Sequence, residues 1–186
     1  MVAYLVMATL GMAEPHAAAP LLVRDLENRA VDPLQSDAAV TATALVFVSV
    51  DCPISNRYAP DIRRLIDTFT EKGVRFWLVY PNPAESAGAI RKHLAAYSYP
   101  NRALRDPQHQ LARVAQITVT PEAAVFTRAG ALAYHGRIDD RIVELGRERP
   151  TPTTHDLAQA LATVLSGKPV SPASTQAFGC FVADFK

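Results

Sequence analysis

Two apolar segments, and the amphipathic stretch that joins them, constrain the fold of this chain most strongly. Residues 42–50 form a continuous apolar run, which is typical of a strand covered on both faces. Residues 55–72 are expected to form a helix, because apolar side chains recur there at helical spacing (Ile62, Leu65, Ile66 and Phe69). Residues 74–80 form a second apolar run. This order predicts a β-α-β unit with parallel strands and a right-handed connection.

Weaker patterns predict the remaining elements. They are a hairpin over 21–34, helices over 85–97, 106–115 and 157–165, a short strand over 102–104, and a strand pair over 123–135 that turns at 128–130. Parallel strands followed by an antiparallel pair predict an α/β fold, in which helices flank a central mixed β-sheet on both faces. The charged stretch 134–141 is expected to be a solvated loop with salt bridges. The alternatives are that its Asp–Arg pairs fix the loop beside the site or that it covers a partner surface.

Length, charge and the first residues set further limits. A chain of 186 residues suits one domain, and a formal net charge of +1 favours neither nucleic acid nor an acidic membrane surface as a partner. Residues 1–19 contain a short apolar run followed by small residues, which is typical of an export signal and too short for a membrane span of about 20 residues. A basic segment is missing at the start, and a buried strand or helix is the alternative. We expect export to the periplasm or the extracellular space, with no membrane span in the mature chain.

Cys52 is the candidate reactive residue. It follows the first apolar run and precedes Pro53 and the predicted helix, so its thiol is expected at a helix N-terminus, which favours the thiolate. Cys180 is the only other cysteine, and the two form no CxxC motif. From the residues alone, a structural disulfide or two unrelated thiols remain open.

The run from Asp51 to Pro60, together with Thr120-Pro121, resembles the redoxin group of thioredoxin-like proteins, which includes alkyl hydroperoxide reductase/thiol-specific antioxidant and Sco-like sequences. The resemblance covers residues 20–167 and implies a thioredoxin-like fold, followed by a tail over 168–186. It implies that Cys52 is the nucleophile. It also implies a cis bond before Pro121 and a Thr120 backbone that pairs with an incoming peptide; an ordinary trans proline is the alternative.

The sequence departs from these relatives at the second cysteine. Thioredoxins place it where this chain has Ser55, and Sco-like proteins place it where this chain has Asn56. Cys52 therefore acts alone or is resolved by another thiol. Peroxiredoxin-like proteins often resolve through a C-terminal cysteine, so the resemblance implies a disulfide between Cys52 and Cys180, within one chain or between two.

Supporting roles are assigned to the neighbours of Cys52. Asp51 could relay a proton, although its charge would raise the pKa of the thiol, or it is a loop acid or helix cap. Asn56 could bond near the thiolate or cap the turn, and Arg57 is expected to be solvated rather than paired with the thiolate. Pro53 and Ser49 complete the predicted site.

Three functions follow from the resemblance. The first is thiol–disulfide exchange with a protein that carries a thiol or a disulfide, which needs no cofactor. The second is peroxide reduction: Ser49 lies where peroxiredoxins have Thr or Ser, but Leu45 stands where they have proline. The third is Sco-like copper binding through both cysteines and a histidine, although neither His109 nor His135 lies in a ligand motif, and no metal site is predicted.

Overall fold

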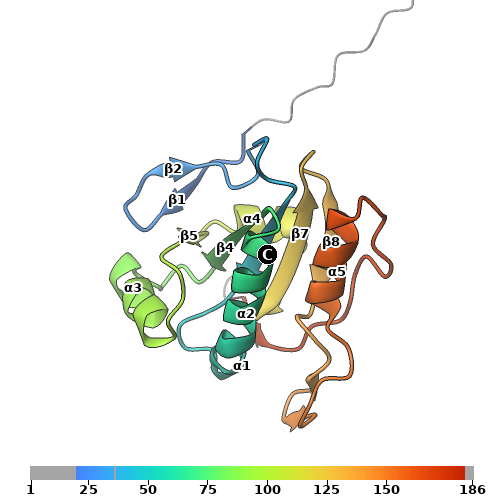
Figure 1. Ribbon diagram of the computed structural model, residues 1–186. Helices are drawn as coiled ribbons and strands as arrows, with labels where there is room; N and C mark the ends of the chain where they lie inside the picture. The colour runs from blue at the N-terminus through green and yellow to red at the C-terminus, as the bar shows by residue number, and fades with distance from the viewer. Residues whose placement is uncertain (1–19, 36, 183–186) are drawn as a thin grey trace, which may run out of the picture.

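The computed structural model describes residues 20–35 and 37–182. Seven strands form one mixed sheet in the order β2-β1-β5-β4-β3-β7-β8 (Figure 1). The export signal predicted for residues 1–19 lies outside the described residues. Within the described part of the chain, none of the helices has the length and apolar character that a membrane span requires.

The predicted β-α-β unit lies at the centre of the sheet. β3 (Ala42–Phe47) and β4 (Val74–Tyr80) are parallel neighbours. All residues of β3 are buried, because β4 and β7 (Glu122–Thr127) pair with its two edges and helices cover its faces. The strand predicted over 42–50 ends at Phe47, since the chain leaves the sheet there and turns toward a helix.

The single helix predicted over 55–72 is wrong, because the structure has two helices. α1 (Pro53–Arg57) and α2 (Ala59–Thr70) are separated by Tyr58, which is the C-cap of the first and the N-cap of the second. Pro60 causes the break, since it has no amide hydrogen and its ring would collide with the carbonyl four residues earlier in a continuous helix. In the first turn of α2 the same proline is tolerated.

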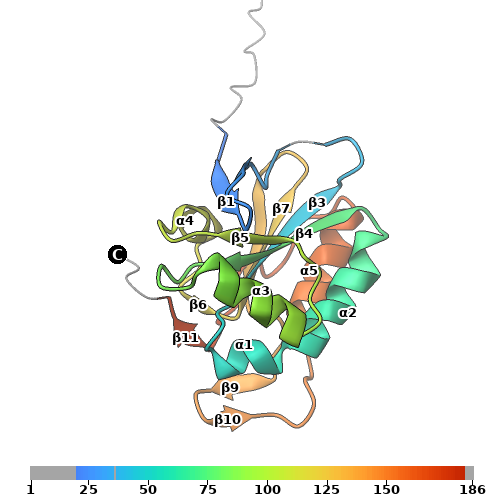
Figure 2. The same ribbon diagram turned by 90° about the vertical axis from the view of Figure 1, so that its left-hand side faces the viewer.

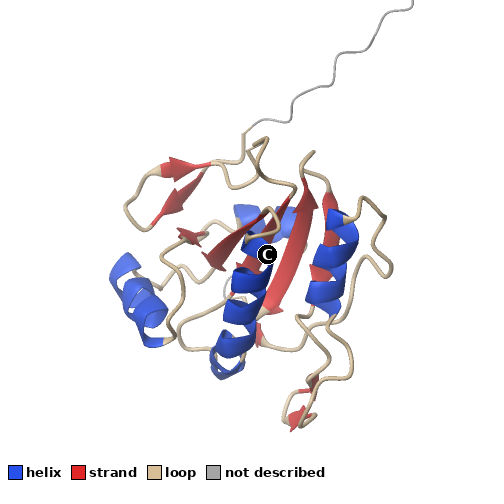
Figure 3. Cartoon of the chain, viewed as in Figure 1, coloured by secondary structure: helices blue, strands red, loops and turns tan. Residues whose placement is uncertain are grey.

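Helices cover both faces of the sheet, as predicted (Figures 1 and 3). One face carries α2, α3 (Ala87–Ala96) and α5 (Asp156–Leu165), and the other carries α4 (Gln110–Ala115). Neighbouring residues of β3 point to opposite faces, so Val46 belongs to the first core and Phe47 to the second.

Shorter strands extend the sheet on both sides. They are β5 (Ala103–Arg105), parallel to β4; β1 (Val23–Asp25) and β2 (Ala30–Val31), which form an antiparallel hairpin; and β8 (Leu132–Gly136), antiparallel to β7. The predicted hairpin and strand pair are therefore confirmed.

Two helices begin later than predicted, and in each a preceding side chain accepts hydrogen bonds from first-turn amides. The Ser86 hydroxyl accepts a hydrogen bond from a backbone amide of the first turn (3.1 Å), and α3 begins at Ala87. The Asp106 carboxylate accepts hydrogen bonds from the amides of Gln110 (2.7 Å) and Ala112 (2.9 Å). α4 therefore begins at Gln110, and Asp106 lies outside it.

The charged stretch 134–141 is not the solvated loop that the sequence suggested. Asp139 and Asp140 are both buried. The Tyr58 hydroxyl donates to Asp139 (2.6 Å), and Arg149 donates to Asp140 (3.1 Å). These contacts fix the loop beside the start of α2.

The C-terminal segment packs along the domain and ends in a strand that the sequence did not reveal. The His135 amide donates to the Ala173 carbonyl (3.0 Å), and the Thr175 amide donates to the His135 carbonyl (3.1 Å), so this part lies against β8. Further on, β11 (Cys180–Phe181) pairs antiparallel with β6 (Val119–Thr120), as Figure 2 shows.

Candidate active site

Cys52 lies where strand β3 gives way to helix α1, as the sequence predicted. It is the N-cap of α1, and its sulfur accepts a hydrogen bond from the Ser55 amide (3.5 Å). Pro53 is the first residue of α1, where its missing amide hydrogen costs nothing. An amide that points at this sulfur stabilises a thiolate over a thiol whenever the cysteine is reduced.

Cys52 is bonded to Cys180. The two Cα atoms are 6.1 Å apart, although 128 residues separate them in the sequence. The Cys52 side chain is almost completely covered, with an exposed fraction of 2% for the residue, whereas Cys180 is partly exposed. The disulfide therefore closes the site with the C-terminal segment of the same chain.

Thr120 and Pro121 lie beside this disulfide. The peptide bond between them is cis. The Thr120 carbonyl oxygen is 3.1 Å from the Cys52 sulfur, and Cys180 is the direct antiparallel partner of Thr120. Four residues that the sequence singled out from three distant segments therefore meet in one place.

Asn56 holds the loop that carries Cys52. Its side-chain amide donates to the Val50 carbonyl (3.1 Å), and its side-chain oxygen accepts from Nε2 of His93 (2.8 Å). The other ring nitrogen of His93 then accepts from the Tyr80 hydroxyl (2.8 Å). Burial lowers the pKa of His93, which favours this neutral arrangement.

Sequence reasoning missed His93 and Tyr80. The one available signal was that His93 precedes Leu94 and follows Ile90 by three residues, on the predicted inward side of a helix. All three residues are buried in the structure.

Ser49 binds a carboxylate that sequence reasoning also missed. The Ser49 hydroxyl (2.6 Å) and the Val50 amide (2.7 Å) both donate to the same oxygen of Glu85. The second oxygen of Glu85 is buried without a hydrogen-bond partner among the described residues. Burial raises the pKa of Glu85, and the two hydrogen bonds offset this effect only in part.

Asp51 and Arg57 lie at the surface. Asp51 is exposed, and it is not the cap of α1, since Cys52 has that position. Arg57 is exposed and forms an ion pair with Glu148, whereas the sequence led us to expect a solvated side chain.

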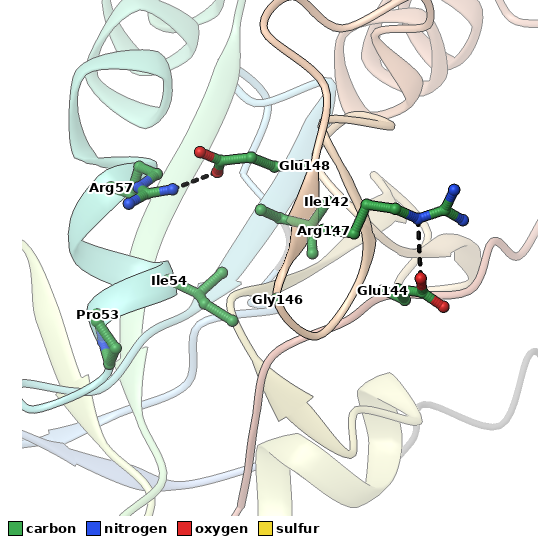
Figure 4. A pocket seen from close by; sticks show the side chains of 8 residues that line it. All are labelled: Pro53, Ile54, Arg57, Ile142, Glu144, Gly146, Arg147 and Glu148. Atoms are coloured by element: carbon green, nitrogen blue, oxygen red, sulfur yellow. Dashed lines mark hydrogen bonds and ion pairs between the residues drawn. The ribbon is translucent and has the colours of Figure 1, made fainter.

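A hollow of about 360 Å³ lies next to Pro53, between α1 and the hairpin of β9 (Ile142–Glu144) and β10 (Arg147–Glu148). Figure 4 shows Ile54 and Ile142 within it, between two ion pairs. One of these pairs joins Arg57 to Glu148, and the other joins Arg147 to Glu144 (2.8 Å). The surface beside Cys52 is therefore apolar at its centre and charged at its rim.

The histidines considered for copper have other neighbours. Nε2 of His109 donates to the Pro81 carbonyl (3.0 Å), and Nδ1 of His135 is 4.0 Å from the Glu122 carboxylate. No group of three or more His, Cys, Asp or Glu side chains within residues 20–35 and 37–182 is arranged to hold a metal ion.

A family comparison identifies the chain. Residues 20–135 match the model of the AhpC/TSA family. The chain belongs to the AhpC/TSA family. The match covers β3, Cys52 and the Thr120–Pro121 turn, but it stops before the segment that carries Cys180. The redoxin resemblance seen in the sequence is thus confirmed for this AhpC/TSA member.

Solved structures give the fold of the AhpC/TSA member. An uncharacterized conserved protein from Geobacillus kaustophilus superposes with a TM-score of 0.74 at 24% identity, covering 91% of this chain and 90% of that one. A hypothetical protein from Sinorhizobium meliloti gives 0.72 at 23% identity, covering 89% and 91%. A secreted Mycobacterium tuberculosis disulfide oxidoreductase homologous to Escherichia coli DsbE gives 0.54 at 17% identity, covering 76% and 93%. The fold is thioredoxin-like, as predicted; no curated protein matches the sequence.

Proposed function

We propose that this chain is a thiol–disulfide oxidoreductase in which Cys52 and Cys180 form the redox pair. The observation that carries this proposal is the disulfide itself, which joins the N-cap of α1 to a strand paired with Thr120. The secreted disulfide oxidoreductase among the similar structures has the same fold, which adds support.

The reaction needs only thiols and disulfides. In the reduced chain the Cys52 thiolate attacks a partner disulfide, which forms a mixed disulfide and releases one partner thiolate. The Cys180 thiolate then attacks the Cys52 sulfur, which forms the Cys52–Cys180 disulfide and releases the second partner thiolate. Two electrons move to the partner, and the reverse sequence oxidises a partner dithiol. No cofactor takes part.

The stoichiometry of a small disulfide reagent tests the proposal. We expect the reduced chain to release two aromatic thiolates per chain from dithiobis-nitrobenzoate and to keep no adduct, because Cys180 expels the second one. Cys180→Ser should release one and keep the adduct on Cys52. Cys52→Ser should react only as slowly as an ordinary exposed thiol. A wild-type chain that keeps two adducts without forming its disulfide would refute the redox pair.

Peroxide reduction is the second candidate, because AhpC/TSA is the matched family. The Cys52 thiolate would attack the peroxide, giving a sulfenic acid and an alcohol or water, and Cys180 would convert the sulfenic acid to the disulfide with loss of water. Ser49 stands where peroxiredoxins have Thr or Ser, but its hydroxyl hydrogen is donated to Glu85. This hydrogen bond weakens the match to a peroxidase site. Rapid consumption of hydrogen peroxide that disappears in Cys52→Ser would favour this candidate over the first.

The proposed site of action is an oxidising compartment outside the cytoplasm. The disulfide and the secreted relative of the same fold support this placement, together with the export signal expected in residues 1–19. Fractionation of cells that express the full chain would test it, and recovery in the cytoplasm alone would refute it.

A further inference from the structure

The short strand β11 lies across the active site as an added strand. Cys180 pairs with Thr120, and Phe181 pairs with Val119. The Val182 amide extends this pairing by donating to the Thr118 carbonyl (3.1 Å). This is the geometry with which an extended peptide joins an exposed strand edge.

Gly179 can approach this edge only because it has no side chain. A Cβ atom at this position would lie 2.2 Å from the Thr120 carbonyl oxygen and 2.7 Å from its carbon. Both are backbone atoms that cannot rotate away. The same carbonyl oxygen lies 3.1 Å from the Cys52 sulfur, so a shift of the backbone here would displace the site itself.

The redoxin resemblance already implies that an incoming peptide pairs with the Thr120 backbone, in the place that β11 occupies here. We propose that this edge of β6 selects partner segments with glycine immediately before the reactive cysteine. This inference rests on the proposed function and names its partner. To bond with Cys52, a partner sulfur must take the position of the Cys180 sulfur. A partner strand in that register brings its preceding residue against the Thr120 carbonyl, where only glycine fits.

The residue after the cysteine is under no such restriction. Phe181 is 83% exposed, so its side chain extends into solvent rather than into a pocket. The site therefore selects strongly for the partner residue that precedes the reactive cysteine and only weakly for the residue that follows it. Because Cys52 is 2% exposed beneath β11, the C-terminal segment must leave the β6 edge before a partner enters.

Peptide disulfides test the selection on full-length Cys180→Ser, in which Cys52 is the only thiol. The probes are Phe-Gly-Cys-Phe and Phe-Ala-Cys-Phe, each joined through its cysteine to thionitrobenzoate. The Cys52 thiolate attacks the peptide sulfur and releases coloured thionitrobenzoate, and the rate is followed at equal peptide concentrations. We expect the glycine peptide to react about tenfold faster or more, because overlap with fixed backbone atoms is costly. A third peptide, Phe-Gly-Cys-Ala, should match the glycine peptide within about threefold, since the following residue is exposed.

Two controls separate the possible outcomes. Free glutathione should react equally with the glycine and alanine peptides, which excludes an intrinsic difference between them. Gly179→Ala in the Cys180→Ser chain should speed both peptides, because it loosens the competing strand, and should keep their ratio. Equal rates for the glycine and alanine peptides, with normal reaction of Cys52 toward dithiobis-nitrobenzoate, would overturn the selection and leave the proposed function intact. A Cys52 that reacts with neither peptide nor reagent would overturn both.

Discussion

Individual residues around Cys52 explain why a distant cysteine completes the site. Ser55 stands where a thioredoxin has its second thiol, and here it contributes its amide to the Cys52 sulfur. Asn56 is held between Val50 and His93, so it serves the loop rather than the sulfur. Neither residue can resolve a mixed disulfide, and the second thiol reaches Cys52 from the end of the chain.

The Asn56 hydrogen bonds are expected to stabilise this loop. Asn56→Ala removes both bonds and leaves buried polar atoms on Val50 and His93 without partners, which should lower the free energy of unfolding by about 1–3 kcal/mol. Urea denaturation measures the loss. The exposed Asn101→Ala serves as the control and should change stability by less than about 0.5 kcal/mol. Equal losses in the two variants would show that the chain of hydrogen bonds contributes nothing.

Glu85 is expected to make stability depend on pH. Burial raises its pKa, so the folded chain keeps this proton at pH values where the unfolded chain, with an ordinary pKa of about 4.3, has lost it. The folded state binds more protons there, and the free energy of unfolding falls as the pH rises above about 4. Because Glu85→Gln cannot titrate, its stability should fall less than that of the wild type between about pH 4.5 and 7.

Urea midpoints across this pH range measure the Glu85 effect. Glu122 is also buried with a raised pKa, and it contributes equally to both proteins, so the difference isolates Glu85. The exposed Glu71→Gln should follow the wild type. Parallel profiles for Glu85→Gln and the wild type would contradict the prediction.

At the scale of elements, the sequence was most informative where a strand is long and buried. β4 matches its predicted range over 74–80 because apolar side chains fill it at every position except Arg75 and Pro81 follows it directly. The break between α1 and α2 was missed because the spacing of Ile62, Ile66 and Phe69 outweighed the signal from Pro60. Apolar spacing reports which side of a helix is buried, but it does not report where the helix starts.

The strand β11 could not have been predicted from local pattern. It spans two residues, which is too short for any alternation of apolar and polar side chains. It pairs with β6, a strand far away in the sequence, and the segment before it lies along β8. The register that brings Cys180 opposite Thr120 is therefore a property of the folded domain.

Gly136 is expected to control how firmly the C-terminal segment is docked. Its φ is +141°, and a Cβ atom there would lie 2.3 Å from the Thr175 carbonyl oxygen. Gly136→Ala should push this segment away from β8, and dithiothreitol should then reduce the Cys52–Cys180 disulfide several-fold faster. Alkylation and mass spectrometry follow the reduction.

Gly130→Ala is a matched control for this change. Gly130 also has a positive φ (+78°), but a Cβ atom there would meet nothing within 4 Å. The Gly130→Ala variant has the backbone strain of a positive φ without the collision. It should leave the rate at which dithiothreitol reduces the disulfide unchanged. If both variants speed reduction equally, strain in the sheet rather than docking of the segment is responsible.

At the scale of the whole molecule, the C-terminal segment joins parts of the domain that the sheet alone does not connect. After α5 it runs along the β8 edge. Its strand β11 then pairs with β6 beside the N-terminus of α1 (Figure 2). The disulfide thus closes a loop of 128 residues that contains most of both cores, although the central strand β3 lies outside it. We expect reduction to leave this segment attached to β8, because the hydrogen bonds between His135 and residues 173–175 do not involve the sulfur atoms.

The stability of the oxidised and reduced forms distinguishes a redox pair from a structural disulfide. Folding and disulfide formation form a thermodynamic cycle. The free energy that the disulfide adds to the stability of the fold therefore equals the free energy that folding adds to the stability of the disulfide. Chain entropy alone predicts about 4.7 kcal/mol for a loop of about 100 residues. For a pair that exchanges with partners we expect less, about 1–3 kcal/mol, because part of this gain is given up to keep the bond reducible. Urea denaturation with and without dithiothreitol measures the difference, and Cys180→Ser should match the reduced wild type within about 0.5 kcal/mol. A stabilisation of about 5 kcal/mol or more would instead favour a structural role for Cys52 and Cys180, since it would lower the reduction potential of the bond by about 100 mV and make it harder for partner thiols to open.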